Sequence, residues 1–250
     1  MFIDTHCHLT DKYLDCADTV IERATKANVG VMICPTAAPS DIHNAIQLTQ
    51  KHDNIFCTIG IHPEYAPTDA TTYLADKILT HPKVVGVGEI GLDYHYSQDN
   101  RFEQITLFKQ QLEIARQYDL PVAIHTREAE ADTAEILDTD VRGVMHCFTS
   151  SWDLAHKMLD KGFFFSASGI LTFKNADDVR ATFEKIPLNR IVIETDAPYC
   201  APVPYRGKTC EPAMVIETAR VLAEIKGISI EELETALMEN VKQLYPKIKY

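Results

Sequence analysis

The chain has 250 residues, of which 46% are hydrophobic, so it is long enough to bury a sizeable core in one or two domains. Its formal net charge of −12 argues against a broad basic surface for nonspecific binding of duplex nucleic acid. That charge leaves room for a small basic cleft, or for a metal centre that supplies positive charge locally. No apolar run approaches the roughly 18 residues that a membrane span needs.

Two further features of the sequence concern the cellular compartment. The amino-terminal segment FIDTHCH leads directly into an apolar strand pattern, so we expect no signal peptide. The seven cysteines are odd in number and none has CxxC spacing, which fits reduced thiols better than a disulfide framework. We therefore expect a cytoplasmic protein without a membrane segment.

Short, β-rich apolar runs recur along the chain and are expected to be strands. They span residues 2–7, 29–34, 55–61, 84–90, 121–125, 143–147, 162–168 and 190–195. Runs such as VGVMIC are apolar almost throughout, which fits strands of a parallel sheet covered on both faces.

Helix-like stretches separate these runs. They span residues 17–28, 39–52, 70–80, 99–119, 128–138, 152–161 and 175–185. The longest has apolar residues at helical spacing, namely Phe102, Ile105, Phe108, Leu112 and Ala115. Eight strands alternating with helices predict an α/β fold, a (β/α)8 barrel of the TIM type. An open doubly wound sheet is less favoured, because the candidate ligands described below extend from the first run to the eighth.

Two more helices are expected in the tail. The first covers about 212–226, with Pro212 near its first turn and Gly227 at its end. The second begins after Ser229, which forms a capping-box pattern with Glu232. We expect this tail, about residues 212–245, to pack on the barrel, and residues 1–250 to form a single domain.

Six potential metal ligands stand at the carboxyl ends of separate apolar runs. They are His6, His8, Glu89, His125, His146 and Asp196. Widely separated ligands converge only if their strands lie side by side, and the carboxyl ends of barrel strands carry the active site of TIM-type enzymes. A mixture of imidazole and carboxylate suits Zn²⁺, Mn²⁺ or a related divalent ion.

Each of these signals has an ordinary structural interpretation when taken alone. The pair His6 and His8 would point to one face of a strand, but such a pair also occurs in turns and cores. Glu89 is costly to bury without a partner, and a salt bridge would satisfy it as well as a metal. His125 and His146 could be hydrogen-bonded core histidines. Their joint position at strand ends favours the metal site, with Asp4 and Thr5 as possible orienting groups.

Several residues near the same barrel rim are candidates for substrate contacts. His62 follows the third strand in TIGIHPEYA, where it would either donate a hydrogen bond to substrate or pack within its loop. Arg127 follows the fifth strand. The segment YRGK, with Tyr205, Arg206 and Lys208, follows the eighth strand, where a phosphate would lie beside the metals; a solvated loop is the alternative.

At these residues the chain resembles the TatD family of metal-dependent hydrolases, within the amidohydrolase-like barrels. The matching segments run from residue 3 to residue 208 and are IDTHCH, GIHPEYA, GEIGLDY, HTR, HCF and ETDAPYCAPVPYRGK. The resemblance implies a (β/α)8 barrel and a metal-dependent deoxyribonuclease, and several members of the family have 3′–5′ exonuclease activity on single-stranded DNA. Two departures stand out: Cys210 occupies a position that is usually asparagine, and Glu64 replaces a histidine in GIHPE.

The resemblance also implies a role for each ligand. His6, His8 and Asp196 would hold one divalent ion (Mg²⁺, Mn²⁺ or Zn²⁺), His125 and His146 would hold a second, and Glu89 would bridge the two. Asp196 and Glu89 would be the catalytic residues. No obligate protein partner is expected, and DNA would bind locally at the metal cleft.

The sequence is compatible with three functional hypotheses. The leading hypothesis is hydrolysis of phosphodiester bonds by a metal-activated water, with Asp196 orienting that water and accepting its proton, and with Arg206 and His62 positioning the phosphate. The second is a small-molecule amide, ester or lactone hydrolase, which the negative charge slightly favours. The third is a metal-binding scaffold without turnover, and the intact ligand set argues against it.

Overall fold

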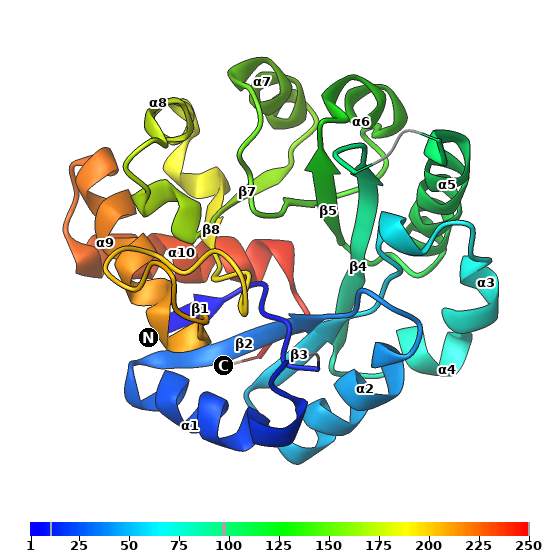
Figure 1. The fold of residues 1–250 in the computed structure, drawn as a ribbon, viewed down its shortest axis with the longest axis horizontal. Coiled ribbons are helices and arrows are strands. Elements are labelled where there is room, and N and C mark those ends of the chain that lie inside the picture. The colour runs from blue at the N-terminus through cyan, green and yellow to red at the C-terminus, as the bar shows by residue number, and fades with distance from the viewer. Residues whose placement is uncertain (11, 97–98, 250) are drawn as a thin grey trace.

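The computed structural model describes residues 1–10, 12–96 and 99–249 and shows a parallel eight-stranded sheet surrounded by helices (Figure 1). Within these residues the strands follow one another in chain order, each pairing with the next. The strands are β1 (Phe2–Asp4), β2 (Val29–Pro35), β3 (Ile55–Thr58), β4 (Val84–Asp93), β5 (Val122–Arg127), β6 (Gly143–Met145), β7 (Phe164–Ala167) and β8 (Ile191–Ile193).

The first and last strands meet just beyond their carboxyl ends. A parallel bridge joins Cys7 to Ala197, and the backbone N–H of Thr5 donates to the carbonyl of Ile193 at 3.1 Å. The backbone N–H of His8 also donates to the carbonyl of Ala197. These bonds bring the ends of the sheet together, so the predicted TIM-type barrel is confirmed and the open sheet is excluded.

Helices cover the outside of this barrel (Figure 1). Among the described residues the α-helices are α1 (Ala17–Lys26), α2 (Asp41–Lys51), α3 (Ala70–Tyr73), α4 (Asp76–Leu79), α5 (Arg101–Gln117), α6 (Glu130–Ile136), α7 (Trp152–Asp160), α8 (Asp177–Lys185), α9 (Val215–Lys226) and α10 (Ile230–Leu244). Short 3₁₀ turns are η1 (Leu14–Cys16), η2 (Pro63–Tyr65), η3 (Gly169–Thr172), η4 (Leu188–Arg190) and η5 (Pro212–Met214).

Two helix predictions need correction. The single helix expected over 70–80 is two short helices, α3 and α4, because the weak helix formers Thr71 and Thr72 precede a break at Leu74, whose ψ is 63°. The helix expected from residue 212 begins as a 3₁₀ turn at Pro212 before α9 starts at Val215. Its predicted end is confirmed, since Gly227 adopts a left-handed conformation with φ of 64°.

The predicted helix over 99–119 is present as α5, but its apolar residues are not all buried. Phe102 is 78% exposed, whereas Gln104 and Gln111 are buried. Gln104 accepts a hydrogen bond from the backbone N–H of Asp93 and donates one to its carbonyl, at 2.9 and 2.8 Å, and Gln111 does the same for Ile61. The two amides are therefore satisfied inside the protein, and they fix the segments that carry residues of the barrel rim.

Two layers of buried apolar side chains hold the barrel together. The larger lies between strands and helices and includes Met32, Leu112 and Phe165. The smaller joins strand residues such as Ile33 to α10 and the segment after it. The smaller layer comprises Ile3, Val31, Ile33, Phe56, Val85, Ala123, Val144, Phe164, Val192, Val241, Leu244, Tyr245 and Ile248.

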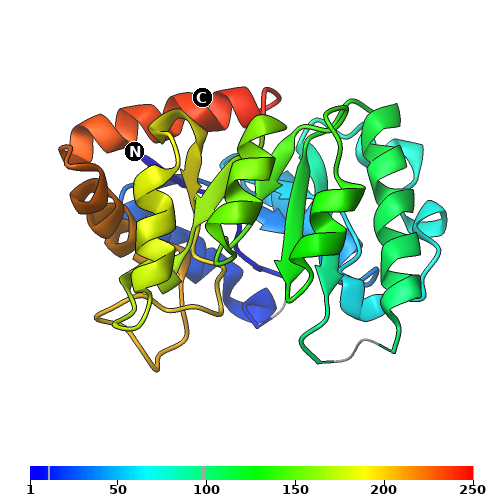
Figure 2. The ribbon, with the colours of Figure 1, turned by 90° about the horizontal axis from the view of Figure 1, so that it is seen from above.

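Helix α10 lies across the amino-terminal end of the barrel (Figure 2). The buried amide of Asn240 donates to the carbonyls of Leu188 and Ile191 at the start of β8, at 2.8 and 2.6 Å. Lys247 donates to the carbonyl of Val84 at the start of β4, at 3.0 Å. This end is thus closed by protein, and access to the barrel is from the carboxyl ends of the strands.

No helix among the described residues is both long enough and apolar enough to cross a membrane.

Candidate metal centre

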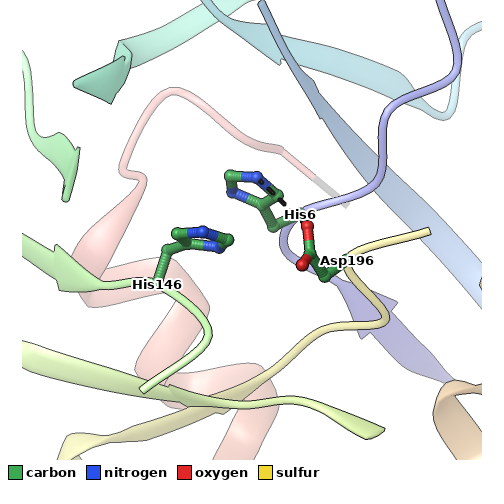
Figure 3. A group of neighbouring side chains, drawn as sticks. All are labelled: His6, His146 and Asp196. Atoms are coloured by element: carbon green, nitrogen blue, oxygen red, sulfur yellow. Dashed lines mark ion pairs between the residues drawn. The ribbon is translucent and has the colours of Figure 1, made fainter. Parts of the chain in front are cut away.

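All six predicted ligands converge at the carboxyl ends of the strands. His6 and His8 follow β1, Glu89 lies within β4, and His125 lies within β5. His146 follows β6 and Asp196 follows β8. Figure 3 shows His6 facing the ring of His146, with Asp196 beside it. Closure of the barrel therefore brings together residues that are separated by up to 190 positions in the chain.

The carboxylate of Glu89 is the centre of this group, and its two oxygens face different histidines. Oε1 lies 2.9 Å from Nδ1 of His125 and 3.0 Å from Nε2 of His146. Oε2 lies 3.3 Å from Nε2 of His6 and 3.6 Å from Nε2 of His8. The side chain is only 5% exposed, so one buried carboxylate joins two pairs of imidazoles.

The electrostatics of Glu89 follow from this environment. Burial alone raises the pKa of Glu89, but the charge of His146 and hydrogen bonds from three imidazoles hold that pKa well below its ordinary value. Burial likewise opposes protonation of His146, yet the charges of Glu89 and Glu194 raise the pKa of His146 well above its ordinary value. The centre therefore keeps its carboxylate ionised and has a strong affinity for positive charge.

Asp196 completes the side of the group that contains His6 and His8. Its Oδ1 lies 3.6 Å from Nε2 of His8 and 3.9 Å from Nε2 of His6. Burial raises the pKa of Asp196, but the hydrogen bond from His8 and the nearby imidazoles lower it overall. Burial and the charge of His146 lower the pKa of His6, which favours the neutral imidazole that metals bind.

Glu194 orients His146 and was not predicted. It is 1% exposed, and its Oε1 lies 2.9 Å from Nδ1 of His146 and accepts from the backbone N–H of Cys147 at 2.9 Å. A carboxylate on the outer nitrogen fixes the ring so that Nε2 faces the centre, as is typical of metal-ligating histidines. The sequence carried a signal, because Glu194 is a charged residue directly after the apolar run of β8.

Asp93 is a second orienting carboxylate that was not predicted. Its Oδ2 lies 3.1 Å from Nε2 of His125, on the opposite side of the ring from Glu89. Of the expected orienting groups, Asp4 accepts from the backbone N–H of His6 at 3.3 Å and also bonds the side chain and backbone of Thr195, while Thr5 donates to the carbonyl of Ile193. Both tie β1 to the segment after β8 and leave the imidazole rings to other partners. Burial raises the pKa of Asp4 to about 8.

His62 lies closest to the centre among the predicted substrate contacts. Its Nε2 is 3.8 Å from Oε1 of Glu89, and its ring meets that of His125 edge to face at 4.6 Å. Nδ1 accepts from the backbone N–H of Glu64 at 3.2 Å, which places the proton on Nε2, the nitrogen that faces the centre. Burial lowers the pKa of His62 to about 4.

The other predicted substrate contacts are spread along the rim. Arg127 is exposed and lies 5.2 Å from the ring of Tyr96. Arg206 lies 3.7 Å over the ring of Phe173. Tyr205 is half-buried against the apolar core, with the Lys208 ammonium 5.7 Å from its ring. These contacts place the residues on rim loops, and their role with substrate stays a prediction.

A group of two thiols adjoins Asp196. Cys147 follows His146, and Cys200 lies in the loop after β8. Their sulfur atoms and one oxygen of Asp196 lie within 4.8 Å of one another. Sequence pattern does not predict this group, because the two cysteines are more than fifty residues apart and belong to no metal-binding motif.

A family model described as TatD related DNase matches residues 3–246. The chain belongs to the TatD-related DNase family. The metal-dependent hydrolase YcfH of Escherichia coli K12 is 37% identical over 254 residues, covering 97% of this chain and 95% of the relative. The metal-dependent hydrolase YabD of Bacillus subtilis is 36% identical over 252 residues, covering 98% and 99%.

Solved structures agree with this family assignment. The crystal structure of YJJV, a TatD homologue from Escherichia coli K12, matches with a TM-score of 0.87 at 28% identity and covers 98% of both chains. An organophosphorus hydrolase mutant from Deinococcus radiodurans matches with a TM-score of 0.64 at 12% identity, covering 98% of this chain and 92% of that one. At that identity the second likeness shows the barrel fold alone.

The donor set of this TatD-family chain fits divalent cations. Imidazole nitrogens and carboxylate oxygens are ligands that Zn²⁺, Mn²⁺ and related ions accept. Two groups, His6 with His8 and Glu89, and Glu89 with His125 and His146, each have their ligand atoms within 4.8 Å of one another. Glu194 holds one outer nitrogen in place, which leaves the inner one free to bind.

The two departures from the TatD pattern lie around this site. Glu64 is exposed, and its backbone N–H binds His62, while burial raises the pKa of its carboxyl. Cys210 is buried, and its carbonyl accepts a hydrogen bond from the hydroxyl of Tyr13. Cys210 therefore serves the packing of its loop against η1.

Proposed function

We propose that this member of a family with metal-dependent hydrolases is a two-ion phosphodiesterase that cleaves single-stranded DNA from its 3′ end. One observation carries the proposal: the two oxygens of Glu89 face two separate histidine pairs, at 2.9–3.0 Å and 3.3–3.6 Å. A carboxylate in that position can bridge two cations. Paired ions are typical of enzymes that cleave phosphodiester bonds, because they stabilise both the attacking and the leaving oxygen.

The residues divide into two ligand sets. His6, His8 and Asp196 would hold one ion, His125 and His146 the other, and Glu89 both. Mg²⁺, Mn²⁺ and Zn²⁺ are the candidates. Bound divalent ions polarise phosphoryl oxygens and lower the pKa of water from about 15.7 toward about 7.

Asp196 is the proposed proton acceptor. Its carboxylate faces His8 at 3.6 Å, and its lowered pKa keeps it ionised at neutral pH. It would orient the attacking water and take its proton. We expect Asp196→Asn to bind metal weakly or to turn over poorly; near-normal hydrolysis by this variant would exclude the assigned role.

The rim supplies contacts for a single strand. His62 presents its Nε2 proton toward the centre, where a phosphate oxygen can accept it. Arg127 and Arg206 carry exposed positive charge beside Tyr96 and Phe173. Tyr96 is 83% exposed and can stack on an unpaired base. With a net charge of −12, such local contacts must replace a broad basic surface.

Hydrolysis of end-labelled single-stranded DNA tests the proposal. The metal-free protein is assayed with Mg²⁺, Mn²⁺ or Zn²⁺ and with a chelator, using strands labelled at either end. We expect metal-dependent release of mononucleotides from the 3′ end, lost in Glu89→Ala. Glu231→Ala is the matched control, since it removes an exposed carboxylate of α10 at the other end of the barrel.

A small-molecule hydrolase is the competing function, and the net charge of −12 favours it. It predicts that metal-loaded protein leaves DNA intact and hydrolyses esters, amides or lactones, again with loss in Glu89→Ala. A panel of such substrates, run beside the DNA assay, decides between the two.

A further inference from the structure

The two thiols beside Asp196 form a donor group next to the histidine centre. Sγ of Cys200 donates to Oδ2 of Asp196 at 3.6 Å, and Sγ of Cys147 donates to Oγ of Ser168 at 3.2 Å. The two sulfurs and one carboxylate oxygen lie within 4.8 Å of one another. Three side chains that can bind cations therefore converge, and the proposed hydrolysis uses only one of them, Asp196.

The two oxygens of Asp196 serve different neighbours. Oδ1 faces the imidazoles of His6 and His8, at 3.9 and 3.6 Å. Oδ2 faces Cys200. Asp196 thus offers one oxygen to the histidine centre and the other to the thiols, as Glu89 does between its two histidine pairs.

The backbone holds all three members of this group in an uncommon conformation. Cys147, Asp196 and Cys200 have φ values of 41°, 56° and 51°. They are half of the six non-glycine residues with positive φ in the described part of the chain. Such conformations are unfavourable for residues with a side chain and persist where the surroundings fix them, often at functional sites.

We propose that Cys147, Cys200 and Asp196 form a third cation site, selective for a thiophilic divalent ion such as Zn²⁺ or Cd²⁺, which shares Asp196 with the histidine centre. Zinc–thiolate bonds are about 2.3 Å long, so two sulfurs on one tetrahedral ion lie about 3.8 Å apart. In the structure the two sulfurs lie within 4.8 Å of each other and of the Asp196 oxygen, which is compatible with that spacing. Soft thiolates also distinguish this site from the imidazole and carboxylate centre, which accepts harder ions.

Occupation of this site has a consequence for hydrolysis. An ion on Oδ2 of Asp196 withdraws charge from the carboxylate that faces His6 and His8 and fills space beside them. We therefore expect excess Zn²⁺ or Cd²⁺ to inhibit hydrolysis. This consequence rests on the proposed function, whereas binding of the ion does not.

Titration of metal-free, reduced protein with Cd²⁺ tests the site without substrate. Thiolate ligands give an ultraviolet charge-transfer band that imidazole and carboxylate ligands lack. We expect a saturable band in the wild type and in Cys16→Ser, which removes an exposed cysteine elsewhere. Loss of an outer hydrogen-bond partner already weakens metal binding by about 10–100-fold, so Cys200→Ser and Cys147→Ser should weaken it at least as much.

The outcomes separate the proposal from its alternatives. An equal band in Cys200→Ser and Cys147→Ser, or no saturable band in the wild type, overturns it. So does a mass two hydrogens lower with a Cys147–Cys200 cross-link under the reducing titration conditions, since the pair would then form a disulfide. Circular dichroism of each variant checks the fold. A protein that shows the band but leaves DNA intact supports the site and counts against the nuclease.

Discussion

Both ends of the barrel contain buried side chains, but those at the amino-terminal end are apolar and those at the carboxyl end are ionisable. At the amino-terminal end, Val241, Leu244 and Tyr245 of the last helix and its extension pack on apolar strand residues. At the carboxyl end, Glu89 and His146 are equally buried but ionisable, and they face one another across about 3 Å. The same strands extend from one end to the other, so the two ends differ in their side chains and not in their backbone.

This contrast separates stability from function. Apolar burial at the amino end stabilises the fold directly. A concentration of buried imidazoles and carboxylates is costly to desolvate, and such groups persist where their shifted pKa values serve binding or catalysis. We therefore expect substitutions at the carboxyl end to remove activity with little loss of fold, and substitutions at the amino end to do the reverse.

Glu89→Ala should give the largest effect. It removes the carboxylate shared by both histidine pairs, and a lost metal contribution is worth several kcal/mol, so kcat should fall on the order of 10³-fold or more. Steady-state kinetics and metal analysis measure this, with thermal unfolding as the check on the fold. Retained activity with two bound ions would contradict the bridging role.

Leu244→Ala should give the largest effect on stability. Leu244 is 1% exposed within the apolar layer at the amino end, and such truncations cost about 2–5 kcal/mol. Denaturant unfolding measures the loss, with exposed Gln243→Ala as the matched control. The affinity for metal should remain as in the wild type. A large loss of metal affinity in folded Leu244→Ala would show that the two ends are coupled.

Glu194→Gln tests whether Glu194 orients the ring of His146 at the carboxyl end of the barrel. Gln keeps the shape of the side chain but replaces the charged acceptor of Nδ1 of His146 with a weaker, neutral one, so the ring is held less firmly and metal affinity should fall about 10–100-fold. Competition with a chromophoric chelator measures that affinity. Asp93→Asn makes the parallel change at His125. An unchanged metal affinity in Glu194→Gln would show that the charge of Glu194 does not contribute to metal binding.

The sequence identified the barrel because its strands are buried on both faces and so stand out as apolar runs. The candidate ligands could be located for the same reason, since each charged or imidazole side chain at the end of such a run, as in His125 and His146, marks the rim. Both inferences need only local pattern and the closure of the sheet.

Other features depend on contacts that local pattern does not contain. Gln104 and Gln111 are buried because backbone groups at Asp93 and Ile61 satisfy them, whereas the apolar Phe102 is exposed, so the apolar spacing alone does not indicate which residues of α5 are buried. In the segment ETD the sequence offers two carboxylates. The backbone turn at Asp196, with φ of 56°, determines that Glu194 supports His146 from outside while Asp196 faces His6 and His8.

Ser229→Ala should give the smallest effect, and it concerns the start of α10. The predicted capping box is confirmed: Ser229 accepts from the backbone N–H of Glu232 at 3.1 Å, and Glu232 accepts from that of Ser229 at 2.8 Å. Its loss should cost about 1 kcal/mol, or about 2–4 °C in Tm for a chain of this size. Ser229→Asp, which keeps an acceptor, should retain most of that stability. Because α10 closes only the amino end, metal affinity and turnover should stay at wild-type values in both variants, and a loss of either would mean that the helix helps to shape the carboxyl end through the strands.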